Sequence, residues 1–102
     1  MIPLIESKKD ELFALCRRYG VQTLELFGSA TGENFDPATS DLDFLVEYRD
    51  RPIDGSFRDH FALKFDLEAL FGRELDLIES GAIRNPFLLR AIDKNRIVLY
   101  AA

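Results

Sequence analysis

Two aspartates stand one residue apart in the run SDLDFLVEY, which covers residues 40–48. If this run is a β-strand, side chains two apart point to the same side, so Asp41 and Asp43 share one face of a sheet. Carboxylates held this close oppose each other's ionisation unless a positive charge compensates. Because Mg²⁺ prefers oxygen ligands, the spacing predicts a site for a divalent cation.

A glycine and a serine, Gly28 and Ser29, end the preceding apolar run VQTLELF. Glycine lets the backbone approach a ligand closely, and the neighbouring serine offers a hydroxyl and an amide to a phosphate. An isolated Asp-x-Asp is typical of a solvated surface, where Asp41 would end the loop and Asp43 would lie on an exposed strand edge. The glycine–serine pair instead favours a phosphate site that faces a metal site.

Helices and strands alternate along the chain with short connections. Helix signals occupy three segments, residues 4–19, 57–71 and 85–95. Alternating or β-favouring residues predict four strands, at residues 21–27, 41–48, 73–80 and 96–100. Gly20 and Gly72 stand where the first two helices would end. This order predicts an α/β (α+β) fold with one sheet covered by helices, and it leaves the strand directions open.

Composition restricts the class of protein. The chain has 102 residues, of which 47% are hydrophobic, so one domain over residues 1–102 is expected. The single cysteine, Cys16, excludes a disulfide framework and is expected to be buried. No segment approaches the roughly 20 apolar residues that cross a bilayer, so we expect a soluble, cytoplasmic protein. A net charge of −5 with scattered Lys and Arg argues against direct binding of nucleic acid.

The runs LFGS, FDP and SDLDFLVEY together resemble the minimal nucleotidyltransferases of the DNA polymerase β superfamily, specifically their small prokaryotic antitoxin-type members. The resemblance covers nearly the whole chain and includes the later runs FGRELDLIES and RIVLY. It implies a single nucleotidyltransferase-type domain over residues 1–102, with a mixed sheet of about four strands and helices packed against it.

The resemblance also implies a nucleotide-binding set and an acidic set of residues. The members are Gly28, Ser29 and Ser40 in the first set and Asp41, Asp43 and Asp76 in the second. The first set would hold the triphosphate of ATP, and the second would bind Mg²⁺, expected as two ions. Asp76 would also lower the pKa of an attacking hydroxyl or act as its base. Such a site can neutralise the transferring phosphate and hold the reacting oxygens in line.

Other residues of similar chemistry do not occupy the motif positions. Glu47, Glu74 and Glu79 could compete with Asp76, whose alternative role is that of an exposed strand residue. His60 is expected to be a helix-surface or packing residue rather than a general base.

The antitoxin-type resemblance implies a partner, a toxin of the HEPN ribonuclease class that forms a hetero-oligomer with this chain. It further implies transfer of AMP from ATP to a tyrosine of that toxin, which silences it. The closing strand and the long helix are candidate contact surfaces, although core packing explains most of their apolar residues. A small-molecule nucleotidyltransferase of the aminoglycoside-modifying type is a disfavoured alternative, because the chain offers no acceptor-binding domain.

One departure from the family pattern concerns the phosphate site. Relatives often carry a basic residue just after the glycine–serine pair, whereas residues 28–32 read GSATG here. Arg49, Arg51 or Arg73 could replace the missing arginine in space. The loss also makes a second hypothesis plausible, namely a non-catalytic antitoxin that neutralises the toxin by binding alone.

Overall fold

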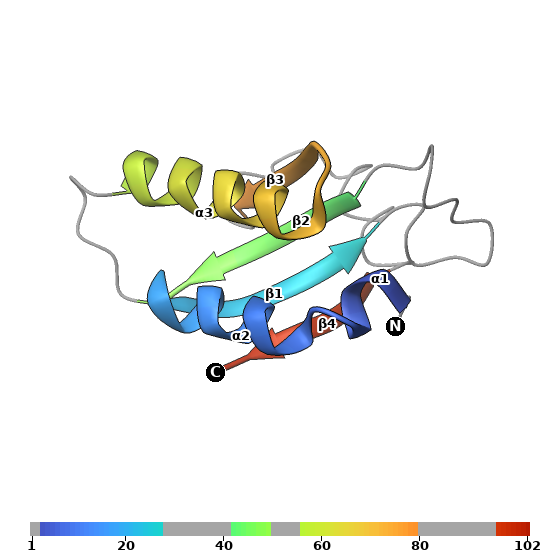
Figure 1. The fold of residues 1–102 in the computed structure, drawn as a ribbon. Coiled ribbons are helices and arrows are strands. Elements are labelled where there is room, and N and C mark those ends of the chain that lie inside the picture. Colours follow the sequence, from blue (N-terminus) through green and yellow to red (C-terminus); the bar gives the residue numbers. More distant parts are fainter. Residues whose placement is uncertain (1–2, 28–41, 50–55, 80–95) are drawn as a thin grey trace.

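The computed structural model describes residues 3–27, 42–49, 56–79 and 96–102, and for residues 56–58 it describes the backbone alone. These residues form three helices and four strands (Figure 1). In chain order the elements are α1 (Pro3–Glu6), α2 (Lys9–Arg18), β1 (Val21–Phe27), β2 (Leu42–Tyr48), α3 (Ser56–Phe71), β3 (Leu75–Glu79) and β4 (Arg96–Ala101). The helix predicted over residues 85–95 lies outside the described residues.

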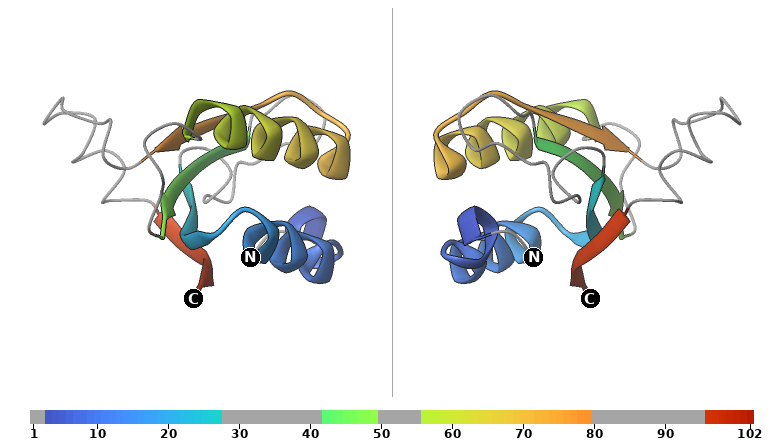
Figure 2. Two further views of the ribbon diagram at one scale, coloured as in Figure 1. Left: turned by 90° about the vertical axis from the view of Figure 1, so that its left-hand side faces the viewer. Right: turned by 90° about the vertical axis from the view of Figure 1, so that its right-hand side faces the viewer.

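The four strands form one mixed sheet in the order β3-β2-β1-β4. β2 and β3 run parallel, whereas β1 is antiparallel to both β2 and β4. Figure 2 shows all three helices on the same side of this sheet. The predicted fold class, a mixed four-stranded sheet with helices packed against it, is confirmed.

The predicted single helix over residues 4–19 is wrong, because the chain forms two helices separated at Ser7 and Lys8. The Ser7 hydroxyl donates a hydrogen bond to the Leu4 carbonyl at 3.0 Å, and the Lys8 amide reaches back only three residues, to the Ile5 carbonyl at 3.1 Å. Serine side chains compete for backbone carbonyls in this way, which tightens the turn. The helix axis can therefore change direction between α1 and α2.

Two glycines end helices at the predicted positions. Gly20 follows α2 with φ 67°, and Gly72 follows α3 with φ 66°. These left-handed conformations are strained for residues that carry a Cβ atom, and they are a common way to end a helix. The chain can thus turn directly from α2 into β1 and from α3 into β3.

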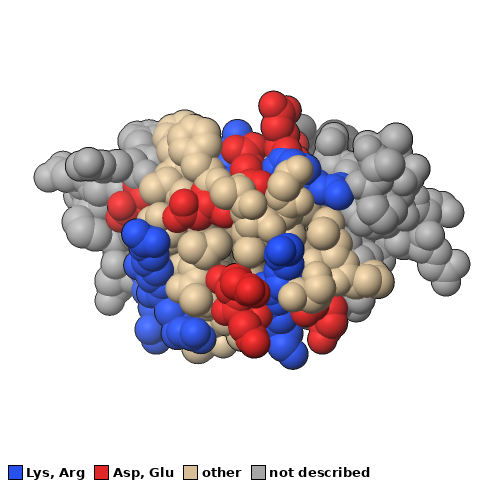
Figure 3. All heavy atoms as spheres, viewed as in Figure 1, with Lys and Arg blue, Asp and Glu red and all other residues tan. Residues whose placement is uncertain are grey.

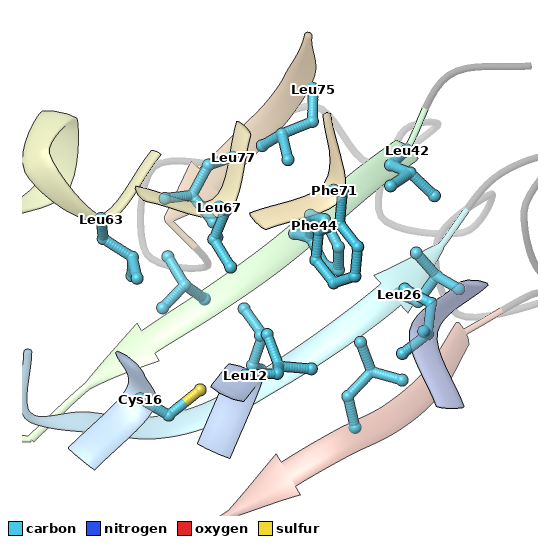
Figure 4. Packing of buried hydrophobic residues seen from close by; sticks show 14 of the residues in the cluster. Leu12, Cys16, Leu26, Leu42, Phe44, Leu63, Leu67, Phe71, Leu75 and Leu77 are labelled. Atoms are coloured by element: carbon cyan, nitrogen blue, oxygen red, sulfur yellow. The ribbon is translucent and has the colours of Figure 1, made fainter. Parts of the chain in front are cut away.

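The core fills the space between the helices and the sheet. Its buried side chains come from all three helices and all four strands and pack toward one another (Figure 4). Phe44 of β2 lies at the centre, completely buried, and stacks on Phe71 of α3 with ring centroids 5.9 Å apart. The Tyr19 hydroxyl at the end of α2 donates a hydrogen bond to the Asp66 carboxylate of α3, and this bond raises the pKa of Tyr19. The two longer helices are therefore joined to each other as well as to the sheet.

Cys16 is completely buried on α2, as predicted. Burial raises the pKa of its thiol from the ordinary value of 9.0 to about 12, because the thiolate would lose its hydration. Between about pH 9 and about pH 12 the thiol is therefore protonated in the folded protein and deprotonated in the unfolded chain. The free energy of unfolding falls as the pH rises through this range.

We expect Cys16 to react with a thiol reagent at pH 8 at least a hundredfold more slowly in the folded protein than in urea, because only the exposed thiolate is nucleophilic. The rate of absorbance change with a chromogenic disulfide measures this. Equal rates in the two states would contradict the burial of this side chain.

No described helix has the length and apolar composition needed to cross a membrane. The predicted cytoplasmic location stays a prediction. On the face of the molecule seen in Figure 3, Lys and Arg side chains are interspersed with Asp and Glu.

Candidate active site

The sheet register places Asp43 beside Asp76. The two residues are direct partners in the parallel pair of β2 and β3. Neighbouring strands lie about 4.8 Å apart, so the two carboxylates begin from adjacent backbone positions. Two of the three predicted acidic residues, separated by 33 positions in the sequence, therefore come together.

The same register extends across the whole sheet. Asp43 is also the partner of Phe27, the last residue of β1, and Phe27 is in turn the partner of Arg96, the first residue of β4. A first row of residues thus crosses all four strands in the order Asp76, Asp43, Phe27 and Arg96. A second row lies next to it and consists of Ile78, Leu45, Glu25 and Val98.

These two rows lie on the face of the sheet that is opposite to the helices, which we call the site face. Leu42 and Phe44 flank Asp43 in β2 and are completely buried in the core beneath the helices. Because successive side chains of a strand point to opposite faces, Asp43 projects away from that core. Asp76 does the same between buried Leu75 and Leu77, which explains a carboxylate within an apolar strand.

The site face is polarised in charge. Asp43 and Asp76 occupy one side of it, on β2 and β3. On the other side, Arg96 forms an ion pair with Glu25, with Nη1 and Oε2 3.4 Å apart. In the first row only Phe27 lies between Asp43 and Arg96. It is buried and packs with Leu45 and Ile78 of the second row.

Four of the predicted site residues lie outside the described part of the chain, namely Gly28, Ser29, Ser40 and Asp41. Among the described residues, no group of three or more His, Cys, Asp or Glu side chains could hold a metal ion. The described residues thus supply two carboxylates on one face and do not by themselves form a metal site. Two carboxylates on one face are oxygen donors of the kind that suits Mg²⁺.

The glutamates that could compete with Asp76 are not in the first row. Glu47 lies toward the opposite end of β2, and Glu74 precedes β3. Glu79 is the partner of Val46, a residue of the core face. The register therefore singles out Asp76 as the described carboxylate next to Asp43.

His60 links α3 to the sheet, so its predicted packing role is confirmed. One ring nitrogen, Nδ1, is 2.9 Å from the Tyr48 hydroxyl, and the other, Nε2, is 3.0 Å from the Leu77 carbonyl oxygen. These contacts connect the helix to both β2 and β3.

The three arginines considered as replacements for the missing loop arginine differ in where they lie relative to the site face. Arg49 directly follows β2, at the end of the strand away from Asp43. Six residues of extended chain place its backbone about 20 Å from the backbone of Asp43, so the prediction that it replaces the loop arginine is wrong. Arg51 lies outside the described residues, and Arg73 lies in the turn before β3. Sequence reasoning missed Arg96, whose position depends on β4 running antiparallel to β1. The available signal was a basic residue at the start of the closing strand.

A hollow lies at the outer edge of the sheet, between α3 and β3. It has a volume of about 420 Å³ and is lined by residues of α3, of β3 and of the turn between them, namely Lys64, Phe65, Glu68, Glu74, Leu75 and Asp76. Glu68 fixes one wall, because its Oε2 accepts a hydrogen bond from the Leu75 amide at 3.2 Å. Asp76 is exposed, so this carboxylate can be reached from solvent.

The family of this chain follows from its similarity to known proteins. Residues 12–99 match the model of a family described as the nucleotidyltransferase domain. The chain belongs to this nucleotidyltransferase family. It is therefore an enzyme that transfers nucleotidyl groups, as its resemblance in sequence predicted.

Relatives of this nucleotidyltransferase agree with the family assignment. A protein of Methanocaldococcus jannaschii with the name "Putative protein adenylyltransferase MJ0128" is 34% identical over 83 residues, which are 81% of this chain and 81% of that protein. A solved structure described as a "putative minimal nucleotidyltransferase" is 29% identical, with a TM-score of 0.72 over 91% of this chain and 90% of that one.

A third likeness shows the shared fold at lower identity. The solved complex of a tri-AMPylated HEPN toxin of Shewanella oneidensis with an MNT antitoxin contains a chain that is 18% identical. The TM-score is 0.66 over 95% of this nucleotidyltransferase and 72% of that chain.

Proposed function

We propose that this nucleotidyltransferase transfers AMP from ATP to a hydroxyl group of a partner protein, with Asp43 and Asp76 at the reaction centre. The observation that carries the proposal is that Asp43 and Asp76 are direct register partners on the site face. Their chemistry suits the assignment, because transfer of a nucleotidyl group requires charge neutralisation on the phosphate and alignment of the reacting oxygens.

We assign the remaining parts of the site to residues that lie close to the first row along the chain. Gly28 and Ser29 follow Phe27 in the chain, and Asp41 and Ser40 precede Leu42. The first two, with Ser40, would bind the triphosphate, and Asp41 would complete the acidic set. Mg²⁺, expected as two ions held by Asp41, Asp43 and Asp76, would neutralise the triphosphate and polarise the transferring phosphate.

The exposures of the two described carboxylates suggest different tasks. Asp76 is exposed on β3, whereas Asp43 is half-buried on the interior strand β2. Asp76 is therefore the described carboxylate of this pair that the hydroxyl of an outside protein can reach more easily. In the proposed reaction, Asp76 accepts the hydroxyl proton as the oxygen bonds to the α-phosphorus. The bond from that phosphorus to the bridging oxygen breaks, and pyrophosphate leaves.

We propose that the acceptor is a tyrosine of a toxin of the HEPN class, and that the two proteins form a hetero-oligomer. This acceptor is supported by the relative named as a protein adenylyltransferase and by the shared fold with the complex that contains an AMPylated HEPN toxin. The contact surface would include α3, where Phe61 and Phe65 are 51% and 62% exposed one helical turn apart. Phe65 and Asp76 both line the hollow at the outer edge of β3.

We expect the double substitution of Phe61→Ser and Phe65→Ser to weaken binding of the partner at least tenfold, because exposed aromatic side chains often dominate binding energy. Titration of the labelled partner measures the dissociation constant. The matched control is Ala14→Ser, an exposed position of α2. Equal dissociation constants for the double variant and the control would contradict this contact surface.

Labelled ATP tests the proposed reaction. The protein is incubated with Mg²⁺, the partner and ATP that carries the label on either the α- or the γ-phosphate. Transfer of AMP attaches the α-label to the partner and releases the γ-label with pyrophosphate. Transfer of the γ-label instead would contradict nucleotidyl transfer, and neutralisation of the toxin without any label would favour the non-catalytic antitoxin.

A further inference from the structure

Two side chains of α3 bind the backbone of β3 on either side of Asp76. The Leu75 amide donates a hydrogen bond to Oε2 of Glu68 at 3.2 Å, and Nε2 of His60 lies 3.0 Å from the Leu77 carbonyl oxygen. Because a carbonyl oxygen can only accept, Nε2 carries the hydrogen and donates it. The residues directly before and after Asp76 are thus each bonded to a side chain of the same helix.

These bonds lie along an edge of the described sheet. Among the described strands, β3 pairs with β2 alone. Leu75 and Leu77 are two residues apart, so their backbone polar groups point to the same side of the strand. The one amide hydrogen of Leu75 is bonded to Glu68, so this side is the one away from β2. The two side chains therefore satisfy backbone groups that a strand exposes where no neighbouring strand pairs with it.

Both side chains are anchored at a second point. The Tyr48 hydroxyl of β2 lies 2.9 Å from Nδ1 of His60, and it donates to this nitrogen because Nε2 is the one that carries the hydrogen. The backbone carbonyl of Glu68 accepts hydrogen bonds from the Gly72 and Arg73 amides at 2.8 and 3.2 Å, where α3 ends. The bonds to β3 therefore start from residues whose own positions are fixed.

We propose that His60 and Glu68 are positioning residues, which hold β3 so that the Asp76 carboxylate stays aligned beside Asp43 during AMP transfer. This inference rests on the proposed function, because it concerns the same reaction centre. A misplacement of about 1 Å can slow an enzymatic reaction about a hundredfold, so a reacting group on an edge strand depends on such support. The alternative is a pair of packing contacts, which would affect stability without affecting the rate of transfer.

Substitution of Glu68 tests the first contact. We expect Glu68→Ala, which removes the acceptor, to lower the rate of AMP transfer about tenfold at saturating ATP and partner, because β3 is then held less closely. Glu68→Gln keeps an oxygen that can accept from the Leu75 amide, so its rate should stay within about threefold of the original. Tyr19→Phe is the matched control, because it removes a different hydrogen bond of α3, the one to Asp66, and should keep the original rate.

Substitution of His60 tests the second contact, because its two nitrogens can be replaced separately. A glutamine places an amide nitrogen near the position of Nε2 and can donate to the Leu77 carbonyl, whereas an asparagine reaches only to the position of Nδ1. We expect His60→Gln to keep the rate within about threefold and His60→Asn to lose about tenfold. All rates are measured at a temperature at which circular dichroism shows each variant to be folded.

The outcomes separate this inference from the proposed function. An original protein that transfers AMP, with Glu68→Ala and His60→Asn variants that transfer it equally fast, would overturn the positioning role alone. Losses as large in Glu68→Gln and His60→Gln would also overturn it, because they would not depend on the bonds to β3. So would an equal loss in Tyr19→Phe, which would show a general loosening of α3. An original protein that transfers no AMP would contradict the proposed function and this inference together.

Discussion

Asp76→Asn is expected to lower the rate of AMP transfer about a thousandfold. The amide cannot accept a proton from the acceptor hydroxyl, and a general base typically contributes between about a hundredfold and ten-thousandfold. It is also a weaker ligand than a carboxylate for Mg²⁺. The measurement is the initial rate at which the α-label reaches the partner at saturating ATP. Asp43→Asn is expected to cause a loss of similar size, because its carboxylate is the register partner of Asp76.

The fold should survive these changes. Like charges directly opposite each other on neighbouring strands are destabilising, so removing one of the two should leave the melting temperature unchanged or raise it slightly. Glu47→Gln is the matched control, because it changes a carboxylate of β2 that is outside the first row. If Asp76→Asn and Glu47→Gln transfer AMP at the same rate, Asp76 does not act at the reaction centre.

Phe44→Ala is expected to lower the free energy of unfolding by about 3–5 kcal/mol, the usual cost of removing a buried aromatic ring. Phe44 is completely buried and stacks on Phe71, so its loss leaves a cavity between β2 and α3. Urea denaturation followed by circular dichroism measures the change. Because Phe44 is next to Asp43, loosening this strand should also weaken the alignment of the carboxylate pair.

The control for this prediction is Phe65→Ala, which removes the same side chain from a position that is 62% exposed. Surface substitutions usually change stability by no more than about 0.5 kcal/mol. Equal losses for the two variants would mean that Phe44 is not at the centre of the core.

Most of the fold could be predicted from the sequence because its signals are local. β1 has the predicted bounds, and α3 ends at Phe71, directly before Gly72, as expected. The break between α1 and α2 was missed, because apolar periodicity continues through it and the competing hydrogen bond of Ser7 has no effect on that pattern. Strand direction also could not be read from the sequence, since it depends on how the connections cross the sheet.

The candidate site was only partly predictable, because it too depends on the direction and pairing of the strands. Asp43 and Asp76 were expected to act together from their motif positions, and the structure makes them direct partners. Arg96 could not be placed beside Phe27 without knowing that β4 pairs with β1 in an antiparallel direction. A residue whose role depends on register across the sheet has no signature in its own stretch of sequence.

The mass of the intact partner after incubation with this chain, ATP and Mg²⁺ tests the central claim most directly. We predict that the partner gains whole AMP units with the original protein, gains none with Asp43→Asn or Asp76→Asn, and is neutralised only when it is modified. A partner that is neutralised equally by all three proteins, with no change in mass, would contradict the proposed transfer of AMP.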